Sequence, residues 1–137
     1  MDELGLNCVF QIESADGSIA RTIIENTLIE IGMPTNIKGF KYIVDTVMLL
    51  SKPEWKDPKW TALYYCVSQL NNCTACSVEK SIRTALRITR DNCIDYNLIE
   101  HYIGFANCEN SNSLTLLYTR LNQSKQKDKA LELMCSI

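Results

Sequence analysis

The chain has 137 residues, 46% of them hydrophobic, and a formal net charge of −2, which together indicate one packed globular domain rather than a disordered protein. No apolar run approaches the roughly 18 residues of a membrane span, and the acidic start, MDEL, lacks the basic region of a secretory signal. These features argue against a membrane protein and predict a cytoplasmic location.

The spacing of apolar residues predicts an all-α fold, a compact bundle of about six helices. Near the N-terminus, the short alternating segment Cys8–Ile12 is either a strand or an irregular arm. Ser18 is expected to cap the first helix, which runs to about Ile31. Gly32 and Pro34 end this helix, because glycine suits the position after a helix and proline blocks its continuation.

A second helix is predicted from about residue 36 to residue 51, and Lys52-Pro53 breaks the chain after it. Asp57-Pro58 then predicts the start of a third helix, with aspartate as the N-cap and proline at the first helical position. This helix runs to about Leu70. The turn Asn71-Asn72 follows, because asparagine tolerates left-handed backbone geometry.

Thr74 is expected to cap a fourth helix over about residues 74–91, and Asp95 is expected to start a fifth helix that ends near Ile103. A loop rich in Asn and Ser leads to a further helix over about residues 112–122. The last dozen residues either extend that helix or form another short one.

Residues 63–90, LYYCVSQLNNCTACSVEKSIRTALRITR, predict two helices joined by a tight polar turn, which is the layout of a helix-turn-helix. On a helical wheel, one side of the second helix is apolar: Val78, Ile82, Ala85 and Thr89, with Ala75 and Leu86 at the edge. The other side is polar and basic: Lys80, Arg83, Thr84 and Arg87, flanked by Ser77 and Arg90. Solvated helices also show this pattern, but the preceding helix and turn favour DNA binding.

Charge is distributed unevenly along the chain. Residues 1–36 hold one base and six acids, a net charge of −5, whereas residues 37–137 hold 13 bases and 10 acids, a net charge of +3. A local basic face matters more for binding phosphate than the total charge does. The modest total nevertheless predicts weak non-specific affinity for DNA.

The seven scattered cysteines are expected to be reduced core or surface residues, because the chain shows no export signal. Cys73 and Cys76 form a C-x-x-C pair that offers an alternative, thiol chemistry or zinc binding. The further ligands available, His101, Cys66 and Cys93, form no second pair. The sequence also lacks a phosphate-binding glycine loop and a convincing Ser/His/Asp arrangement. We therefore predict a protein that is not an enzyme and uses no cofactor or metal.

Three segments resemble the motifs of one family. LIEIGMPTNIKGFKYI (28–43) is similar to a helix–IG-x-P-x-x-IKG-[YF]–helix opening. LYYCVSQLNNCTACSVEKSIRTAL (63–86) is similar to a helix-turn-helix of the pattern LYP-x-[IV]-A…T-x-x-VE-[RK]-x-IR-x-A, and residues 110–121 resemble an NSEF-type final helix. These motifs belong to the C-terminal effector domain of the stage-zero sporulation regulator of endospore-forming bacteria. The resemblance covers residues 20–124 and leaves an N-terminal arm (1–19) and a C-terminal tail or short helix (125–137).

The resemblance implies a bundle of about six helices that binds DNA, with the recognition helix, about residues 74–91, in the major groove. By position, Glu79 and Lys80 correspond to a pair that reaches bases, and Arg83 to an arginine near bases or phosphate. Arg87 extends the same face.

This sequence departs from the family pattern at two positions of the recognition helix. Ser77 stands where the family usually has a base-reading arginine, and Thr84 replaces a frequent histidine. Loss of one bidentate arginine–guanine contact costs on the order of 1–3 kcal/mol. We therefore expect an altered or weaker target sequence rather than a complete loss of DNA binding.

The sequence thus predicts a DNA-binding transcription regulator with double-stranded DNA as its partner. The alternative is a non-enzymatic interaction module that binds or antagonises a full-length regulator or RNA polymerase. Only about 20 residues precede the family match, so we expect no phosphorylation-driven dimerisation through a receiver domain within this chain. A homodimer would use apolar residues at the two ends, which otherwise cover the bundle's own core: Val9, Phe10, Ile12, Leu131, Leu133 and Met134.

Overall fold

The structure is a computed structural model that describes residues 19–55 and 59–135. Over these residues the chain forms six α-helices and one short 3₁₀ helix, as the all-α prediction requires. The helices are α2 (Arg21–Glu30), α3 (Lys38–Leu50), η1 (Pro53–Trp55), α4 (Trp60–Leu70), α5 (Ala75–Asn92), α6 (Tyr96–Tyr102) and α7 (Asn110–Cys135). The predicted segment Cys8–Ile12 lies outside the described residues.

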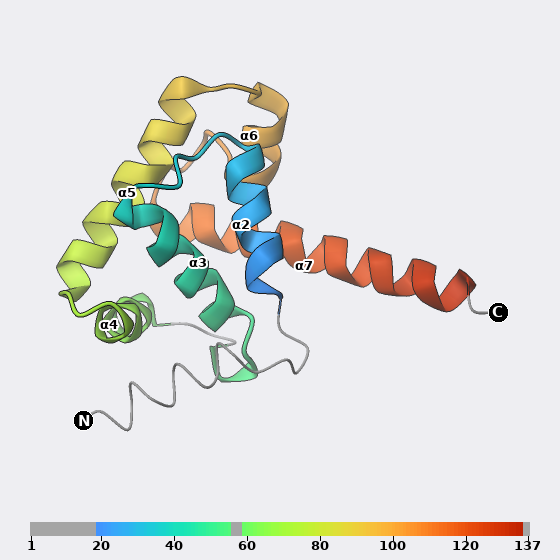
Figure 1. The fold of residues 1–137 in the computed structure, drawn as a ribbon, viewed down its shortest axis with the longest axis horizontal. Helices are drawn as coiled ribbons and strands as arrows, with labels where there is room; N and C mark the ends of the chain where they lie inside the picture. The colour runs from blue at the N-terminus through green and yellow to red at the C-terminus, as the bar shows by residue number, and fades with distance from the viewer. Residues whose placement is uncertain (1–18, 56–58, 136–137) are drawn as a thin grey trace.

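Helix α3 occupies the centre of the bundle, where it packs against α2, α4, α5 and α7 (Figure 1). All but two of its 13 residues are buried, because neighbouring helices cover it on several sides. The remaining helices contribute buried aliphatic side chains to the same core: Ile24, Leu28, Leu63, Val67, Val78, Ile82, Leu86, Ile99, Leu114, Leu117 and Leu121. One hydrophobic core therefore holds the helix-turn-helix segment against the rest of the domain.

Two predicted N-caps are confirmed. The Thr74 side chain accepts a hydrogen bond from the backbone N–H of Ser77 (3.1 Å) at the start of α5. The Asp95 carboxylate accepts one from the N–H of Leu98 (3.2 Å) at the start of α6. Both side chains satisfy a backbone donor that the first turn of a helix leaves without a partner.

The predicted start of the first helix is wrong. Helix α2 begins at Arg21, and its N-cap is Ala20, which makes no side-chain cap. Ala20 is extended (φ −67°, ψ 140°), and Ile19 before it is buried in the core. Packing of Ile19 therefore sets where the helix begins, and Ser18 lies outside the described residues. The end was predicted correctly, since Gly32 follows the helix with φ +93°.

The start of the third helix also differs from the prediction. Helix α4 begins at Trp60 after Lys59, whose backbone is extended (φ −88°, ψ 109°), rather than at Asp57-Pro58. The Trp60 side chain is partly buried against the core, so tertiary packing decides the boundary in place of the local capping signal. Asp57 and Pro58 lie outside the described residues.

Helix α7 is a single helix that continues through residue 135, so the last residues extend the predicted helix rather than form another. Its first half packs on α3, α5 and α6, and its second half projects from the bundle (Figure 1). Met134, near the end, is exposed. Over the described part of the chain, no helix combines the length and apolar character needed to cross a membrane.

Candidate nucleic-acid interface

A tight turn joins α4 to α5 and sets the angle between them. Asn72 adopts the left-handed conformation (φ +52°) that the sequence predicted for this turn. The N–H of Cys73 donates to the carbonyl oxygen of Ser68 (3.0 Å), which closes the end of α4. Because Thr74 then caps α5, only residues 71–74 separate the two helices, and the second helix starts in a defined direction.

The predicted inner face of α5 is confirmed. Four residues of the predicted apolar stripe are buried: Val78, Ile82, Ala85 and Thr89. Leu86, placed at the edge of the stripe, is also buried, whereas Ala75 is only partly so. Helix α5 packs on both α3 and α4, which fixes its rotation about its own axis.

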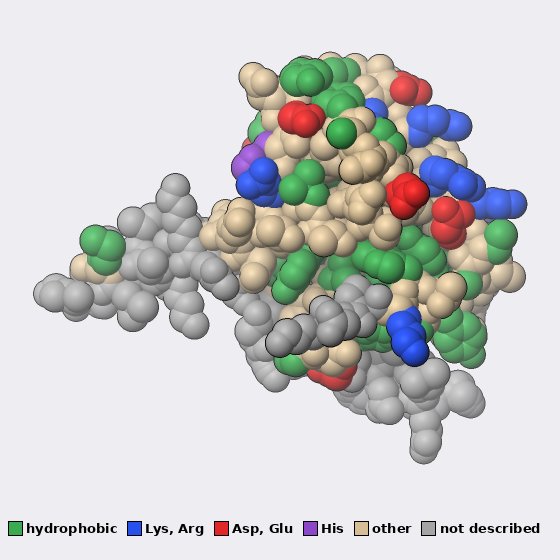
Figure 2. All heavy atoms as spheres, turned by 180° about the vertical axis from the view of Figure 1, so that it is seen from behind, with side chains coloured by type: hydrophobic (Ala, Val, Ile, Leu, Met, Phe, Trp, Pro, Cys, Tyr) green, Lys and Arg blue, Asp and Glu red, His purple; other side chains and the backbone are tan. Residues whose placement is uncertain are grey.

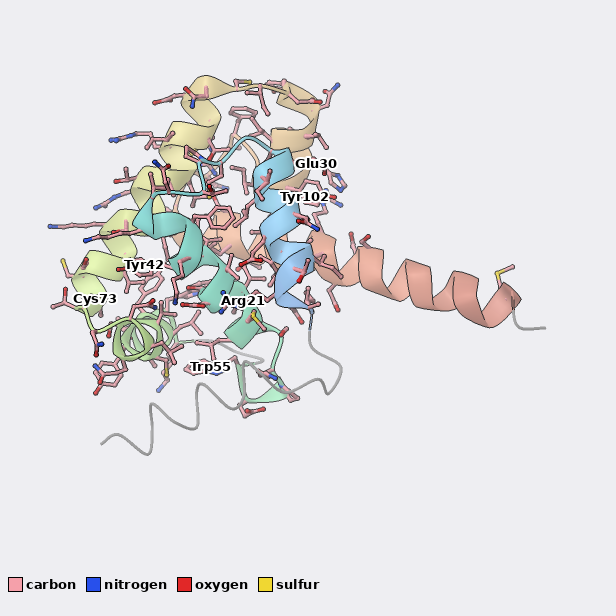
Figure 3. The ribbon with its side chains drawn as sticks, in the orientation of Figure 1. Arg21, Glu30, Tyr42, Trp55, Cys73 and Tyr102 are labelled. Carbon is pink, nitrogen blue, oxygen red and sulfur yellow. The ribbon has the colours of Figure 1, made fainter. Side chains whose placement is uncertain are left out.

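The outer face of α5 carries the basic side chains. Lys80, Arg83, Thr84 and Arg87 are exposed, and Ser77 and Glu79 are partly exposed. In Figure 2, Lys and Arg side chains gather along the edge of the molecule that α5 forms, and in Figure 3 the nitrogen-tipped side chains of α5 point away from the bundle. The structure therefore brings the six predicted site residues onto one helix with its cations directed outward.

Neighbouring side chains orient Glu79. Its carboxylate lies 3.4 Å from the Arg83 guanidinium, one helical turn away. The Asn110 side-chain amide at the start of α7 donates to the Glu79 carbonyl oxygen (2.9 Å) and lies 3.4 Å from its carboxylate. Glu79 thus links the exposed face of α5 to α7 and partly neutralises Arg83.

Arg90 does not belong to the basic face, contrary to the prediction that it flanks it. Its guanidinium donates to the carbonyl oxygens of Gly104 (2.7 Å) and Ile103 (3.2 Å) and to the Ser113 hydroxyl. These contacts close the end of α6 and connect it to α7. Free carbonyl groups at a helix end attract a cation, so a charged residue is drawn inward here.

Gly39 lets α3 and α5 approach closely. A Cβ atom at this position would lie 2.3 Å from the carbonyl oxygen of Ser81 and 2.6 Å from the Ala85 Cβ. Such distances are too short for any side chain, so glycine is required where the two backbones meet. This contact explains the glycine of the IKG segment and positions Lys38 near the outer face of α5.

Sequence reasoning missed Lys38 as a member of this surface. Lys38 is exposed at the first turn of α3, and a groove of about 420 Å³ runs between that turn and α5, lined on the α5 side by Lys80, Ser81 and Thr84. The N-cap of α3, Ile37, makes no side-chain cap, so of the first-turn N–H groups that of Phe40 donates to the Ile37 carbonyl oxygen (3.2 Å), whereas those of Lys38 and Gly39 have no capping side chain. The neighbouring lysine and glycine of IKG were the signal that could have pointed to this contact.

A buried charge cluster holds the turn against the bundle. The Asp45 side chain on α3 is only 2% exposed, and it accepts from the Arg21 guanidinium, the Lys41 ammonium (3.2 Å) and the Asn71 amide (3.0 Å). Asn71 also accepts from Lys41 (2.6 Å) and donates to the Val67 carbonyl oxygen (2.8 Å). The cluster thereby ties α2 and α3 to the turn before α5.

Arg21→Met is expected to lower the free energy of unfolding by about 2 kcal/mol, because it leaves a buried carboxylate with fewer donors. A fully broken buried ion pair typically costs about 3–5 kcal/mol. The loss here should be smaller, because Lys41 and Asn71 still contact Asp45. Urea denaturation measures it. Glu25→Gln removes only the surface contact of Arg21 and should change stability little. A double variant Arg21→Met/Asp45→Leu that is less stable than Arg21→Met would contradict the account.

Tyr42 and Cys73 meet behind the turn, and Figure 3 shows both on the side of the bundle near α4. A hydrogen bond with Cys73, together with burial, raises the pKa of Tyr42 to about 12, so its phenol stays protonated at neutral pH. Within the described ranges, Cys73 and Cys76 belong to no group of three or more potential metal ligands. The zinc hypothesis therefore gains no support from these residues.

His101, the other candidate ligand, is exposed on α6. Its ring lies edge-on to Tyr102, and its carbonyl oxygen accepts from the Arg120 guanidinium (3.0 Å). These contacts connect α6 to α7 and involve neither cysteine of the C-x-x-C pair.

Comparison with known proteins supports the assignment as a DNA-binding domain that the fold and the basic face of α5 suggest. The family model described as "Sporulation initiation factor Spo0A C terminal" matches residues 24–123. The comparison with curated proteins and the comparison with solved structures each gave no match. The matched residues include α3, α4, α5 and α6 and thus the whole helix-turn-helix. The chain belongs to the family of Spo0A C-terminal domains, the DNA-binding effector domains of sporulation initiation.

Proposed function

We propose that this domain is a sequence-specific transcription regulator whose helix α5 lies in the DNA major groove. The observation that carries the proposal is the arrangement of Lys80, Arg83 and Arg87, which are exposed along one face of a helix with a fully packed opposite face. A helix held in this way can enter a groove without rearrangement. Its cations would then lie close to the phosphates of both strands.

The six residues of the outer face would make different contacts with DNA. Lys80 and Arg83 are suited to guanine or phosphate, because both donate to acceptors on the floor and walls of the major groove. Ser77, Glu79 and Thr84 would contact base edges, and a glutamate can accept from a cytosine amino group. Arg87 lies one turn beyond Arg83 and would contact backbone phosphate.

A second phosphate contact is expected at the start of α3. The uncapped N–H groups of that helix attract anions, and Lys38 adds a positive charge beside them. The groove between α3 and α5 brings this point next to Lys80. Two separate helices would therefore contact the DNA backbone. These contacts would fix the position of α5 along the groove.

Arg83→Ala is expected to weaken binding to both target and random DNA and to reduce the slope of log K against log salt by about one unit. Titration of labelled duplexes, random and sporulation-box-like, at two salt concentrations measures both quantities. Lys59→Ala is the matched control, because Lys59 is an exposed cation before α4 rather than on α5. An Arg83→Ala protein with the salt slope of the unmodified protein would contradict a phosphate contact at Arg83.

The second candidate function is a module that binds a full-length regulator or RNA polymerase. The observation that favours it is the exposure of Ile94, between α5 and α6, and of Tyr96, the first residue of α6, which are 64% and 59% exposed. Contiguous exposed apolar patches mark protein contact sites, whereas apolar side chains scattered singly are common on any surface, so this candidate rests on Ile94 and Tyr96 acting as one patch. DNA binding that is absent at low salt, with the fold intact, would favour this function over the first.

A further inference from the structure

Arg83 differs from the other two cations of the outer face, because it has an acid beside it. Among the described residues, no ion pair holds Lys80 or Arg87, whereas Arg83 is paired with Glu79. The guanidinium of Arg83 lies 3.4 Å from Oε1 of Glu79, which precedes it by one helical turn. Helix α5 therefore carries one arginine with a neighbour that can set its direction.

The Glu79 carboxylate is itself held from a different helix. Its other oxygen, Oε2, lies 3.4 Å from the side-chain nitrogen of Asn110, and the same nitrogen donates to the Glu79 carbonyl oxygen (2.9 Å). Asn110 is the first residue of α7 and is only 7% exposed. Partners on both carboxylate oxygens restrict the rotamers that Glu79 can adopt.

Asn110 is in turn held by α4. Tyr64 is a buried residue of that helix, and its phenol contacts the Asn110 side chain. Burial raises the pKa of the Tyr64 phenol, and a hydrogen bond with the Asn110 side chain opposes that rise. A continuous series of contacts thus leads from the buried side of α4, through the start of α7, to Arg83 on the outer face of α5.

The pairing of Arg83 with Glu79 affects direction more than stability. The two side chains are 58% and 37% exposed, and an exposed ion pair adds little to the free energy of unfolding. Arg83 also lines an open groove of about 500 Å³ between α4, α5 and the start of α7. Without the carboxylate, its long side chain would have room to turn into that groove. A side chain that is already oriented loses less rotamer entropy when it binds.

We propose that Asn110 and Glu79 are positioning residues that hold the Arg83 guanidinium in the orientation that reads a guanine. The proposal rests on the proposed function, in which α5 lies in the major groove. A guanidinium donates from a rigid plane, so one edge can face the carboxylate while another faces the O6 and N7 acceptors of guanine. An ionised carboxylate has about four acceptor sites, so Glu79 can still contact a base edge. Base preference at the pair read by Arg83 therefore depends on a buried residue of α7.

The experiment measures the affinity of the whole chain for the sporulation-box-like duplex and for its single base-pair variants. Arg83→Ala first identifies the base pair whose preference depends on Arg83. Asn110→Ala is expected to lower the preference at that pair about fivefold, out of the roughly 5- to 150-fold that one bidentate contact supplies. Affinity for random DNA and the salt slope should stay unchanged, because no charge is removed. In the Arg83→Ala background, Asn110→Ala should have no further effect at that pair.

Glu79→Gln distinguishes positioning from support of the fold. It removes a negative charge beside Arg83, so affinity for random DNA should rise while preference at the Arg83 base pair falls. Loss of structure would lower both. Ser113→Ala is the matched control, because Ser113 is buried one turn further along α7 and contacts Arg90 rather than Glu79. It should keep the base preference of the unmodified protein.

Tyr64→Phe is the second variant, used if circular dichroism shows that Asn110→Ala does not fold. It removes only the hydroxyl that contacts Asn110 and should lower the same preference by a smaller factor. The proposal is overturned if the folded variant leaves preference at the Arg83 base pair unchanged, or lowers target and random affinity equally. If Arg83→Ala itself changes no base preference, the guanine contact of the proposed function fails, and the positioning role fails with it.

Discussion

Ile82→Ala is expected to lower the free energy of unfolding by about 2–5 kcal/mol, because truncation leaves a cavity under the recognition helix. Ile82 is fully buried on the inner face of α5, the helix that packs on both α3 and α4. The loss should lie in the upper part of that range, since the backbones of α3 and α5 already meet at Gly39 and cannot move closer to fill the space.

Urea denaturation followed by circular dichroism measures the loss for Ile82→Ala. Thr84→Ala is the matched control, because Thr84 is exposed two residues further along the same helix and its truncation creates no cavity. The Ile82→Ala protein should retain its affinity for DNA at temperatures where it is folded, since Ile82 does not reach the outer face. If Ile82→Ala changed the free energy of unfolding no more than Thr84→Ala does, the inner face of α5 would not be what anchors this helix to the bundle.

The helix-turn-helix was the most predictable part of the fold because its signals are local. The Thr74 cap acts over three residues, the asparagine turn depends on one left-handed residue, and the stripe that includes Val78 and Ile82 depends only on helical spacing. Tertiary packing does not oppose any of these choices. For the same reason the Asp95 cap at the start of α6 was predicted correctly.

Predictions failed where distant residues decide the outcome. The starts of α2 and α4 follow the burial of Ile19 and Trp60, which a capping rule does not include. Arg90 was placed on a solvated flank, because charged side chains usually face water; the carbonyl groups at the end of α6 instead draw it inward. Only the three-dimensional arrangement of α5 and α6 reveals that contact.

The charge cluster around Asp45 was missed for a related reason. A single acid within the mostly apolar second half of α3 was visible in the sequence, but its donors are 4, 24 and 26 residues away. Pairing over such separations is set by the fold, not by spacing. The same holds for Asn110, which reaches Glu79 across 31 residues and completes the groove beside the basic face.

Replacing Lys80, Arg83 and Arg87 together by alanine is expected to reduce affinity for both target and random DNA by about two to three orders of magnitude near 0.1 M salt. The estimate follows from three lost phosphate-type contacts, each of which contributes about 0.9 to the slope of log K against log salt. All three side chains are exposed, so their removal should leave the core and the free energy of unfolding nearly unchanged.

The charge-conserving variant Arg83→Lys/Arg87→Lys separates electrostatic attraction from base reading. It should keep the salt slope, because two positive charges remain, and lose part of its preference for the target duplex, because lysine lacks the rigid planar fork of donors with which Arg83 would contact a guanine. Duplex titrations at two salt concentrations, with circular dichroism to verify the fold, measure all three proteins under the same conditions. If the folded triple alanine variant binds DNA as tightly as the unmodified protein, α5 is not the DNA-facing helix, and the exposed apolar residues Ile94 and Tyr96 become the better candidate for the functional surface.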